Sequence, residues 1–498
     1  MGRKIRGIFY IVAILLAAGC GKEEETENVF SDGILIEVEA PQTNGWSTEE
    51  ITGTRSGREK AIEVKGKDGL DMEISTLHDN GATGTAEGEA TTRWANMDDN
   101  IVFRVVAYKS ATAAGISTSN YAGYGDYKLS GSTVQTVKSL VVPAGTYTFI
   151  FYSYGNSNAI AAFTNGSASV PATNGQNFMT YVKPGVVINN IGSRYTLSGI
   201  VFKHHCARYR VQAIAQSGRM GTVTACAGTV TLPKHNATYT FTNGAFTTQA
   251  TTGSINLTWD NPNAMSVYSG YIYLLPQTSA NVTVKLNLTI GGKAFSNKSV
   301  TLSGLTMAAN NTYYSNVSFT TTEGYIIGGA LWAGGNLYYD GTFKIYTGQD
   351  QYTTTRGHDF WRFGALYPTD TCIDSTPWAQ VKDPCCRVSP TNSWRVPTIT
   401  EYISLLKVSW EYYTLNSASG LLFDKILFFP STGYFAGANP NNITKSIRGL
   451  YWSANQFYNT EFAPQMLDFV TDNTYPPTRN SSNHPDNFMT KVSHPLKH

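Results

Sequence analysis

The sequence predicts a mainly β protein in which two tandem β-sandwiches precede a C-terminal α+β domain. Three observations predict this fold. Short strand-like runs between turn signals fill residues 34–319, without long helical periodicity. Charged residues make up only 14% of the 498-residue chain, against about 25% in ordinary soluble domains. After Thr322, Trp, Cys, Asp and Pro become more frequent together, which marks a third domain.

The first residues, 1–20, predict a lipoprotein-type signal peptide. Three basic residues precede an apolar run at 8–18, which is about half the ~20 residues that a spanning helix needs. Small residues then lead to Cys20 in Leu-Ala-Ala-Gly-Cys. This segment resembles the bacterial lipobox, although Ala17 stands where Leu is usual. The resemblance implies that Cys20 is lipidated and attaches the mature chain to the outer membrane.

Residues 21–55 are predicted to be a tether and a candidate removable strand. Lys22 and the three glutamates after it resemble the export signal of surface lipoproteins in the Bacteroidetes. A solvated tether is the alternative interpretation. Every later apolar run is short and interrupted by Gly, Asn, Thr or Lys, so we expect the lipid to be the membrane anchor.

Strand patterns predict one sandwich over 56–192 and a second over 193–322. The first set includes 101–108, which is apolar on both faces, and 145–154, which follows a Pro-Ala-Gly turn. In the second set, residues 282–288 alternate between apolar and polar side chains, as a half-buried antiparallel strand requires. The remaining strands of the second set are predicted at 208–214, 254–259 and 271–275.

A family resemblance covers roughly residues 30–320. The chain contains NIVFRVVAYKS and VVPAGTYTFIFYSYGN, then SGIVFKHHCARYRVQAIA and finally LSGLTMAANNTYYSNVSFT. This order resembles the fimbrillin-like pilins and anchor proteins of Bacteroidetes. The resemblance implies transthyretin-like, Greek-key sandwiches in subunits that are exported as lipoproteins. It also implies that a protease cuts after an arginine, and that a neighbouring subunit's strand then fills the vacated groove by β-augmentation.

The best candidate for that cut is Arg55, in the flexible polar stretch Gly-Thr-Arg-Ser-Gly. Arg58 is the nearest competitor, and a plain surface arginine is the alternative interpretation of Arg55. A cut there would release Ile34 to Ala40 together with Cys20 and its lipid.

The C-terminal domain is predicted over 323–498. Thr398 and Glu401 form a capping box that predicts a helix start, with Tyr402, Leu405 and Leu406 on one face. WRVPTITEY, followed by YWSAN, resembles C-type-lectin-like domains of the formylglycine-generating-enzyme and bacterial surface type. The resemblance implies a small helix on a loop-rich sheet, with a final strand near 488–492 returning beside the first.

Cysteine use agrees with an oxidising compartment. The odd number beyond Cys20 leaves one cysteine unpaired. We expect one bridge between Cys206 and Cys226, and a second between Cys372 and one of the adjacent pair. The candidate disulfide residues are Cys206, Cys226, Cys372, Cys385 and Cys386.

Ligand chemistry is only weakly indicated. Trp378, between Pro and Ala in a polar loop, is the candidate sugar contact, whereas Trp394 and Trp452 lie within the motifs and are expected in the core. His204 and His205 point to opposite sides of a strand, so the His-His-Cys run is not a ligand cluster. No pattern predicts a catalytic residue, a metal site or a cofactor, and the net charge of +2 argues against nucleic acid.

These patterns lead to a hypothesis of function. The chain is expected to be a minor or tip fimbrial subunit at the cell surface that joins other fimbrial subunits by strand addition. Its C-terminal domain would mediate adhesion to a host or bacterial surface glycan or protein. The alternative is a lipid-anchored surface glycan-binding protein of a nutrient-uptake system, and a carbohydrate-modifying enzyme is a third reading that lacks an identifiable acid-base pair.

Overall fold

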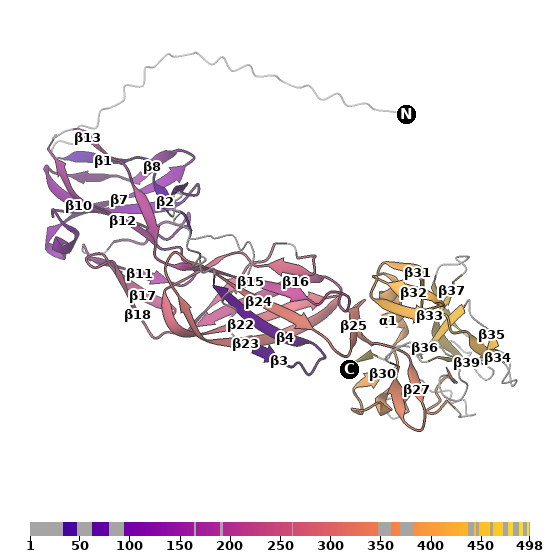
Figure 1. The fold of residues 1–498 in the computed structure, drawn as a ribbon. Coiled ribbons are helices and arrows are strands. Elements are labelled where there is room, and N and C mark those ends of the chain that lie inside the picture. Colours follow the sequence, from indigo (N-terminus) through magenta and orange to yellow (C-terminus); the bar gives the residue numbers. More distant parts are fainter. Residues whose placement is uncertain are drawn as a thin grey trace, which may run out of the picture.

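The protein is seen in a computed structural model as three β-rich bodies in a row (Figure 1). The structure describes residues 33–46, 62–78, 94–163, 166–189, 193–260, 262–346, 360–368, 382–436, 443–444, 448–458, 462–471, 477–481, 488–491 and 496–497. Cys20, Arg55, Cys372 and Trp378 lie outside these ranges. No helix in the described ranges is long and apolar enough to cross a membrane.

The first sandwich packs a large sheet against a small one. The large sheet has eight strands in the order β5 (Trp94–Asn96), β2 (Gln42–Asn44), β14 (Val201–His204), β12 (Met179–Ile188), β10 (Gly145–Ser153), β6 (Val102–Tyr108), β7 (Tyr121–Ser130) and β8 (Thr133–Lys138). The small sheet is β13 (Arg194–Leu197), β1 (Ile34–Val38) and β9 (Leu140–Val142). Ile36, Phe103 and Phe149 are fully buried in one cluster between the two sheets, so the sheets share a core.

The opposite face of the large sheet is also covered. A third sheet consists of β11 (Ser169–Thr173), β17 (Asn236–Thr240) and β18 (Ala245–Thr248). Its Val170 and Tyr239 pack in one cluster with Val106 and Tyr152 of the large sheet. Because both faces of β6 are covered, all seven of its residues are buried, including Arg104. The apolar side chains at the other six positions predict this burial.

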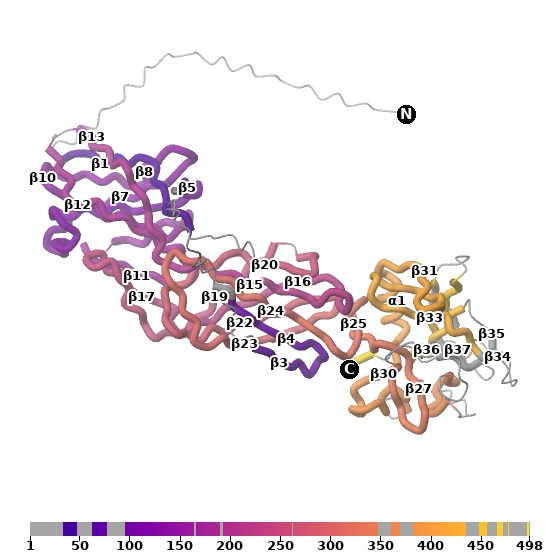
Figure 2. Tube along the Cα trace, in the orientation of Figure 1, coloured from indigo at the N-terminus to yellow at the C-terminus, as the bar shows by residue number. Residues whose placement is uncertain are grey.

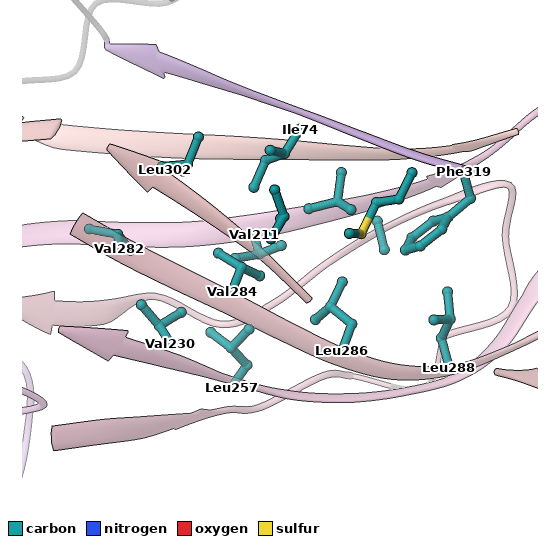
Figure 3. Close-up of a cluster of buried hydrophobic side chains, with 14 of the residues drawn as sticks. Ile74, Val211, Val230, Leu257, Val282, Val284, Leu286, Leu288, Leu302 and Phe319 are labelled. Carbon is teal, nitrogen blue, oxygen red and sulfur yellow. The ribbon is translucent and has the colours of Figure 1, made fainter. Parts of the chain in front are cut away.

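The second sandwich has its own pair of sheets. The six-stranded sheet contains β20 (Ser266–Tyr268), β15 (Ala207–Ala215), β24 (Thr312–Thr320), β4 (Asp71–His78) and β3 (Ile62–Val64), with β21 (Ile272–Leu274) also paired to β15. The four-stranded sheet is β19 (Gly253–Leu257), β16 (Val223–Leu232), β22 (Gln277–Ile290) and β23 (Lys293–Met307). Figure 3 shows Ile74, Val211 and Phe319 of the first sheet facing Val284 and Leu286 of the second.

The two sandwiches are interleaved along the chain. The backbone leaves β2 in the first sandwich, forms β3 and β4 in the second and then returns to β5 in the first. β4 pairs antiparallel with β24 through eight residue pairs, from Tyr313↔His78 to Thr320↔Asp71. Figure 2 shows this indigo hairpin lying along the second sandwich. The boundary predicted at residue 56 is therefore wrong for β3 and β4, because strand alternation indicates the buried face but not the pairing partner.

The C-terminal region, residues 324–497, contains four further sheets. The first is β25 (Gly324–Ile327), β26 (Ala330–Ala333), β40 (Leu496–Lys497) and β30 (Trp394–Arg395), and the second is β27 (Leu337–Tyr339) and β28 (Phe343–Ile345). The third is β35 (Ile443–Thr444), β34 (Tyr434–Ala436), β39 (Phe488–Lys491), β36 (Arg448–Tyr458), β37 (Phe462–Val470) and β38 (Thr478–Ser481), with β29 (Phe360–Trp361) paired to β39. The fourth is β31 (Trp410–Leu415), β32 (Ala418–Phe423) and β33 (Leu427–Pro430).

Within the residues that the structure describes, helical structure is confined to short segments. The one α-helix in the described ranges is α1 (Ile399–Leu406), and the 3-10 turns are η1 (Ala113–Gly115), η2 (Thr118–Asn120) and η4 (Pro384–Arg387). The capping box predicted for α1 is confirmed, because Glu401 Oε2 accepts a hydrogen bond from Thr398 N at 2.7 Å. Tyr402 and Leu405 are fully buried on the inner face of α1, as predicted.

The strand that returns beside the start of the C-terminal region is not the predicted one. Leu496 of β40 pairs with Trp332 of β26. The predicted segment, β39, pairs with β29, β34 and β36. Trp332, Trp361 and Trp452 are fully buried and Trp394 is 6% exposed, so these four rings belong to the core.

Candidate strand-exchange site

The strand β1 occupies the middle of the small sheet of the first sandwich. It runs antiparallel to β9 on one side and parallel to β13 on the other. Ile34, Ile36 and Val38 are 1%, 0% and 8% exposed, and the residues between them are half-buried on the other face. This alternation follows from the pleat of a strand with one face in the core.

Several hydrogen bonds hold the β1 backbone. Leu35 N donates to Ser193 O at 3.1 Å, and Glu39 N donates to Leu197 O at 3.0 Å. From the opposite sheet, the Tyr127 hydroxyl donates to Ile36 O at 2.8 Å. Burial raises the pKa of the Tyr127 phenol, so this hydroxyl stays a donor at neutral pH.

Only one ion pair between side chains contributes to β1 in the described part of the chain. Arg194 Nη1 lies 2.6 Å from Glu37 Oε1, and the two side chains are 72% and 37% exposed. An exposed pair of this kind contributes at most about 1 kcal/mol. The apolar face of β1 therefore dominates its attachment.

After β1, the chain attaches to the large sheet and then to the junction between the sandwiches. β2 lies between β14 and β5. Beyond it, the Trp46 ring stacks on the His204 ring with centroids 4.0 Å apart, and the Arg208 guanidinium lies 5.2 Å from the Trp46 ring. His204 N also donates to Asn44 Oδ1 at 3.1 Å. Nothing in the sequence pattern indicated that Trp46 would reach the second sandwich.

The predicted cut, Arg55, belongs to the undescribed connection 47–61. That connection joins Trp46 at the junction to Ile62 at the start of β3, so the chain on its two sides belongs to different sandwiches. A cut there would separate β1 and β2 covalently from the rest of the chain. Only non-covalent contacts would then hold these two strands.

The three side chains of the His-His-Cys run contact different partners, and they form no ligand cluster. His204 Nδ1 lies 2.8 Å from Asn177 Oδ1, and His205 Nε2 lies 2.7 Å from Thr180 Oγ1. Burial, reinforced by Arg208 and His205, lowers the pKa of His204 to about 4. Burial and then Lys203 lower the pKa of His205 to about 4. Both rings are therefore neutral at neutral pH.

The predicted bridge between Cys206 and Cys226 is wrong, because both thiols are free. Cys206 packs in the cluster between the large sheet and the β17–β18 hairpin, whereas Cys226 lies against the core of the second sandwich. Cys206 Sγ instead lies 3.3 Å from Gln176 O. Burial raises the pKa of both thiols to about 12, so neither is a reactive thiolate at neutral pH.

The other predicted bridge involves Cys372, which lies outside the described residues. Cys385 and Cys386 lie in the buried turn η4, where Asp383 Oδ1 accepts a hydrogen bond from Cys385 N at 2.8 Å. Asp383 Oδ2 accepts a second bond from Val396 N at 2.8 Å. Among the described residues, no group of three His, Cys, Asp or Glu side chains could hold a metal ion.

Comparison with known proteins finds likeness only among solved structures. No protein-family model and no curated protein sequence matches the chain. A Bacteroides fragilis protein assigned to cell adhesion aligns with 16% identity and a TM-score of 0.38, over 59% of this chain and 98% of that one. A Bacteroides ovatus protein of the same assignment aligns with 15% identity and a TM-score of 0.31, over 59% and 98%. The tip fimbrial protein Mfa3 from Porphyromonas gingivalis, truncated at its C-terminus, aligns with 9% identity and a TM-score of 0.28, over 45% and 94%.

Proposed function

We propose that this chain is a minor or tip subunit of a bacterial surface fibre, and that it accepts a neighbouring subunit's strand in the place of β1. The observation that carries the proposal is the position of β1. It is a central strand with a buried apolar face, and it precedes the connection that contains Arg55. The fimbrillin resemblance of residues 30–320 agrees with this assignment.

Loss of β1 would leave a groove that needs to be filled. Fully burying an aliphatic side chain contributes about 1.5–3 kcal/mol. Three apolar side chains of an incoming strand, buried in the places of Ile34, Ile36 and Val38, would therefore contribute roughly 5–9 kcal/mol to the free energy of binding. The backbone groups of β9 and β13 that face β1 would also lose their partners. An incoming strand with alternate apolar residues would restore both ladders at once.

The C-terminal region favours a terminal place in the fibre. Its last described strand, β40, is held between β26 and β30, and Leu496 is fully buried. A strand that is paired on both sides is not available for donation while this region stays folded. The chain is therefore better suited to accept a strand than to donate one, and the C-terminal region, with the C-type-lectin-like motifs, would face outward for adhesion.

Attachment to the cell would change during assembly. Lipid on Cys20 would hold the precursor at the outer membrane, and a cut after Arg55 would release that anchor together with β1. The mature subunit would then be held at the cell surface through the fibre alone.

Strand uptake by the purified chain, before and after a cut at Arg55, tests the proposal. The chain is cut with an arginine-specific protease and mixed with a fluorescent peptide of residues 33–46, and anisotropy reports binding. We expect the cut chain to take up the peptide, whereas the uncut chain competes with its own tethered strand at an effective concentration of about millimolar. Arg55→Lys and Arg58→Lys are matched variants that identify the cut.

A peptide carrying Ile36→Asp is the matched control, because it places a charge in the core and should not bind. Failure of the cut chain to bind the unmodified peptide would refute strand exchange. At the cell surface, N-terminal sequencing of fibre-assembled protein should give Ser56. A start at Cys20 would instead favour the lipid-anchored glycan-binding alternative.

A further inference from the structure

A pocket of about 540 Å³ lies where the first sandwich meets the β17–β18 hairpin. Its walls are the loop that follows β10, the strand β11 and the strand β17. The volume falls in the range of about 300–1,000 Å³ that small-molecule sites occupy. It is separate from the β1 groove, which lies on the opposite face of the large sheet.

No charged side chain lines this pocket. Five side-chain amides do, from Asn156, Asn158, Gln176, Asn236 and Gln249, together with threonine hydroxyls and the Tyr154 ring. The Tyr154 hydroxyl donates to Pro171 O at 2.8 Å. The ring also packs against Phe178 with centroids 5.7 Å apart, so Tyr154 is a fixed aromatic residue of the lining, together with the small side chains of the loop.

Several of the amides keep unused hydrogen-bonding groups. Gln176 Oε1 accepts from Thr173 N at 3.0 Å and Asn156 Oδ1 accepts from Asn158 N at 3.0 Å, which orients both side chains. Their amide nitrogens, and the whole side-chain amides of Asn158 and Gln249, have no hydrogen-bond partner within the described ranges. Each free amide can donate and accept, which suits a ligand that presents hydroxyl groups.

A buried ion pair fixes the loop that forms one wall. Arg104 is 1% exposed and makes a bidentate pair with Asp126, at 2.6 Å and 2.9 Å. The same guanidinium donates to Ala161 O at 2.6 Å and to Ile160 O at 3.0 Å. A wall held by charge-assisted bonds is preorganised, so little ordering cost remains on binding.

We infer that this pocket binds a neutral saccharide, with the amides bonding sugar hydroxyls and the Tyr154 ring and the alanines contacting the apolar sugar face. An acidic sugar is disfavoured because the lining holds no cation to pair with its charge. This site lies outside the C-terminal region, and it does not depend on strand exchange.

Saturation-transfer NMR on the intact chain tests the inference. The probes are glucose, galactose, mannose, fucose and N-acetylglucosamine with their disaccharides, and glucuronic acid and N-acetylneuraminic acid represent acidic sugars. We expect at least one neutral sugar to bind and both acids to give no signal. Asn158→Ala and Gln249→Ala should each weaken binding about five- to tenfold by removing a hydrogen bond. Both side chains are exposed, so neither change should affect folding.

Two further variants locate the binding site. Ala159→Trp fills the pocket and should abolish binding, while Gln135→Ala, an exposed amide on β8 outside the pocket, should leave it unchanged. If Ala159→Trp fails to fold, the double variant Asn158→Ala with Gln249→Ala replaces it and should weaken binding at least about 25-fold. Absence of binding by every neutral sugar, preference for an acidic sugar, or binding that survives these pocket variants would each overturn the inference.

Discussion

The junction between the two sandwiches and the junction with the C-terminal region differ in the contacts that form them. Between the first and second sandwiches, aromatic, histidine and arginine side chains meet beside backbone hydrogen bonds. The Arg208 guanidinium lies 5.2 Å from the Trp46 ring, which stacks on His204, and Gly175 N donates to Tyr273 O at 2.7 Å. Between the second sandwich and the C-terminal region, backbone segments that contain glycine pairs make hydrogen bonds. There, Gly221 N donates to Ile326 O at 2.9 Å and Gly329 N donates to Gly291 O at 2.8 Å.

This difference predicts which junction responds to its surroundings. The charge on a histidine ring changes with pH. An aromatic ring loses its contacts when a neighbour such as Trp46 is removed. The backbone hydrogen bonds at Gly221 and Gly291 involve no titratable group. The first junction should therefore be adjustable, and the second should hold the C-terminal region in a fixed orientation.

Acidification should weaken the junction between the two sandwiches. Of the changes considered, it should lower the free energy of unfolding the most. The pKa of His204 and of His205 is about 4 in the folded chain, against about 6.5 when unfolded. The unfolded chain thus binds more protons between these values, and stability falls as the pH drops from about 6.5 to about 4. We expect a loss of up to about 3 kcal/mol for each histidine, measured by urea unfolding at about pH 7 and about pH 4.5.

The double variant His204→Asn with His205→Gln is the control for this effect. Asn and Gln can keep the hydrogen bonds to Asn177 and Thr180 but do not titrate. The variant should lose most of the pH dependence in that range. An unchanged slope would show that other groups control the acid response.

A methyl group at Gly291 should test the second junction. Gly291 has φ +54°, and an added Cβ would lie 2.3 Å from Ile326 O. Since the contact is with backbone that cannot move aside alone, we expect Gly291→Ala to cost about 3 kcal/mol, measured by calorimetry. Gly199→Ala is the matched control, because Gly199 has φ +66° with no atom within 4 Å of the added Cβ. It should cost only about 1 kcal/mol.

The smallest effect is expected at the exposed ion pair of β1. Glu37→Gln removes the partner of Arg194 and should change the free energy of unfolding by less than about 0.5 kcal/mol. Peptide uptake by the cut chain should likewise change little with added salt. A strong salt dependence would mean that charge, rather than the apolar face, selects the incoming strand.

Local features of this fold could be predicted from the sequence, whereas long-range pairing could not. The helix at Thr398 was predictable because its capping box lies within four residues. The burial of 102–108 followed from its apolar side chains on both faces, except at Arg104, whose buried pair with Asp126 no local pattern indicates. The pairing of β4 with β24 joins segments about 240 residues apart, and many strands in this chain share the same alternation. The same limit explains why the bridge between Cys206, in the bend before β15, and Cys226, on β16, is predicted wrongly.

The candidate sites were predictable only in part. The strand at 34–38 was identified as a removable element, but its central place between β9 and β13 needed the structure. The pocket amides are spread over β17 and three loops, and single Asn or Gln residues are common in this chain. No spacing rule brings them together.

The interleaved path of the chain has a mechanical consequence. The backbone crosses between the two sandwiches at five connections, which are β2 to β3, β4 to β5, β14 to β15 and, around the hairpin that covers the large sheet, β16 to β17 and β18 to β19. It passes only once, from β24 to β25, into the C-terminal region. Tension along the row would thus be shared by parallel covalent connections at the first junction. A cut at Arg55 would leave four of these connections intact, so a subunit could open its groove without losing its tensile strength.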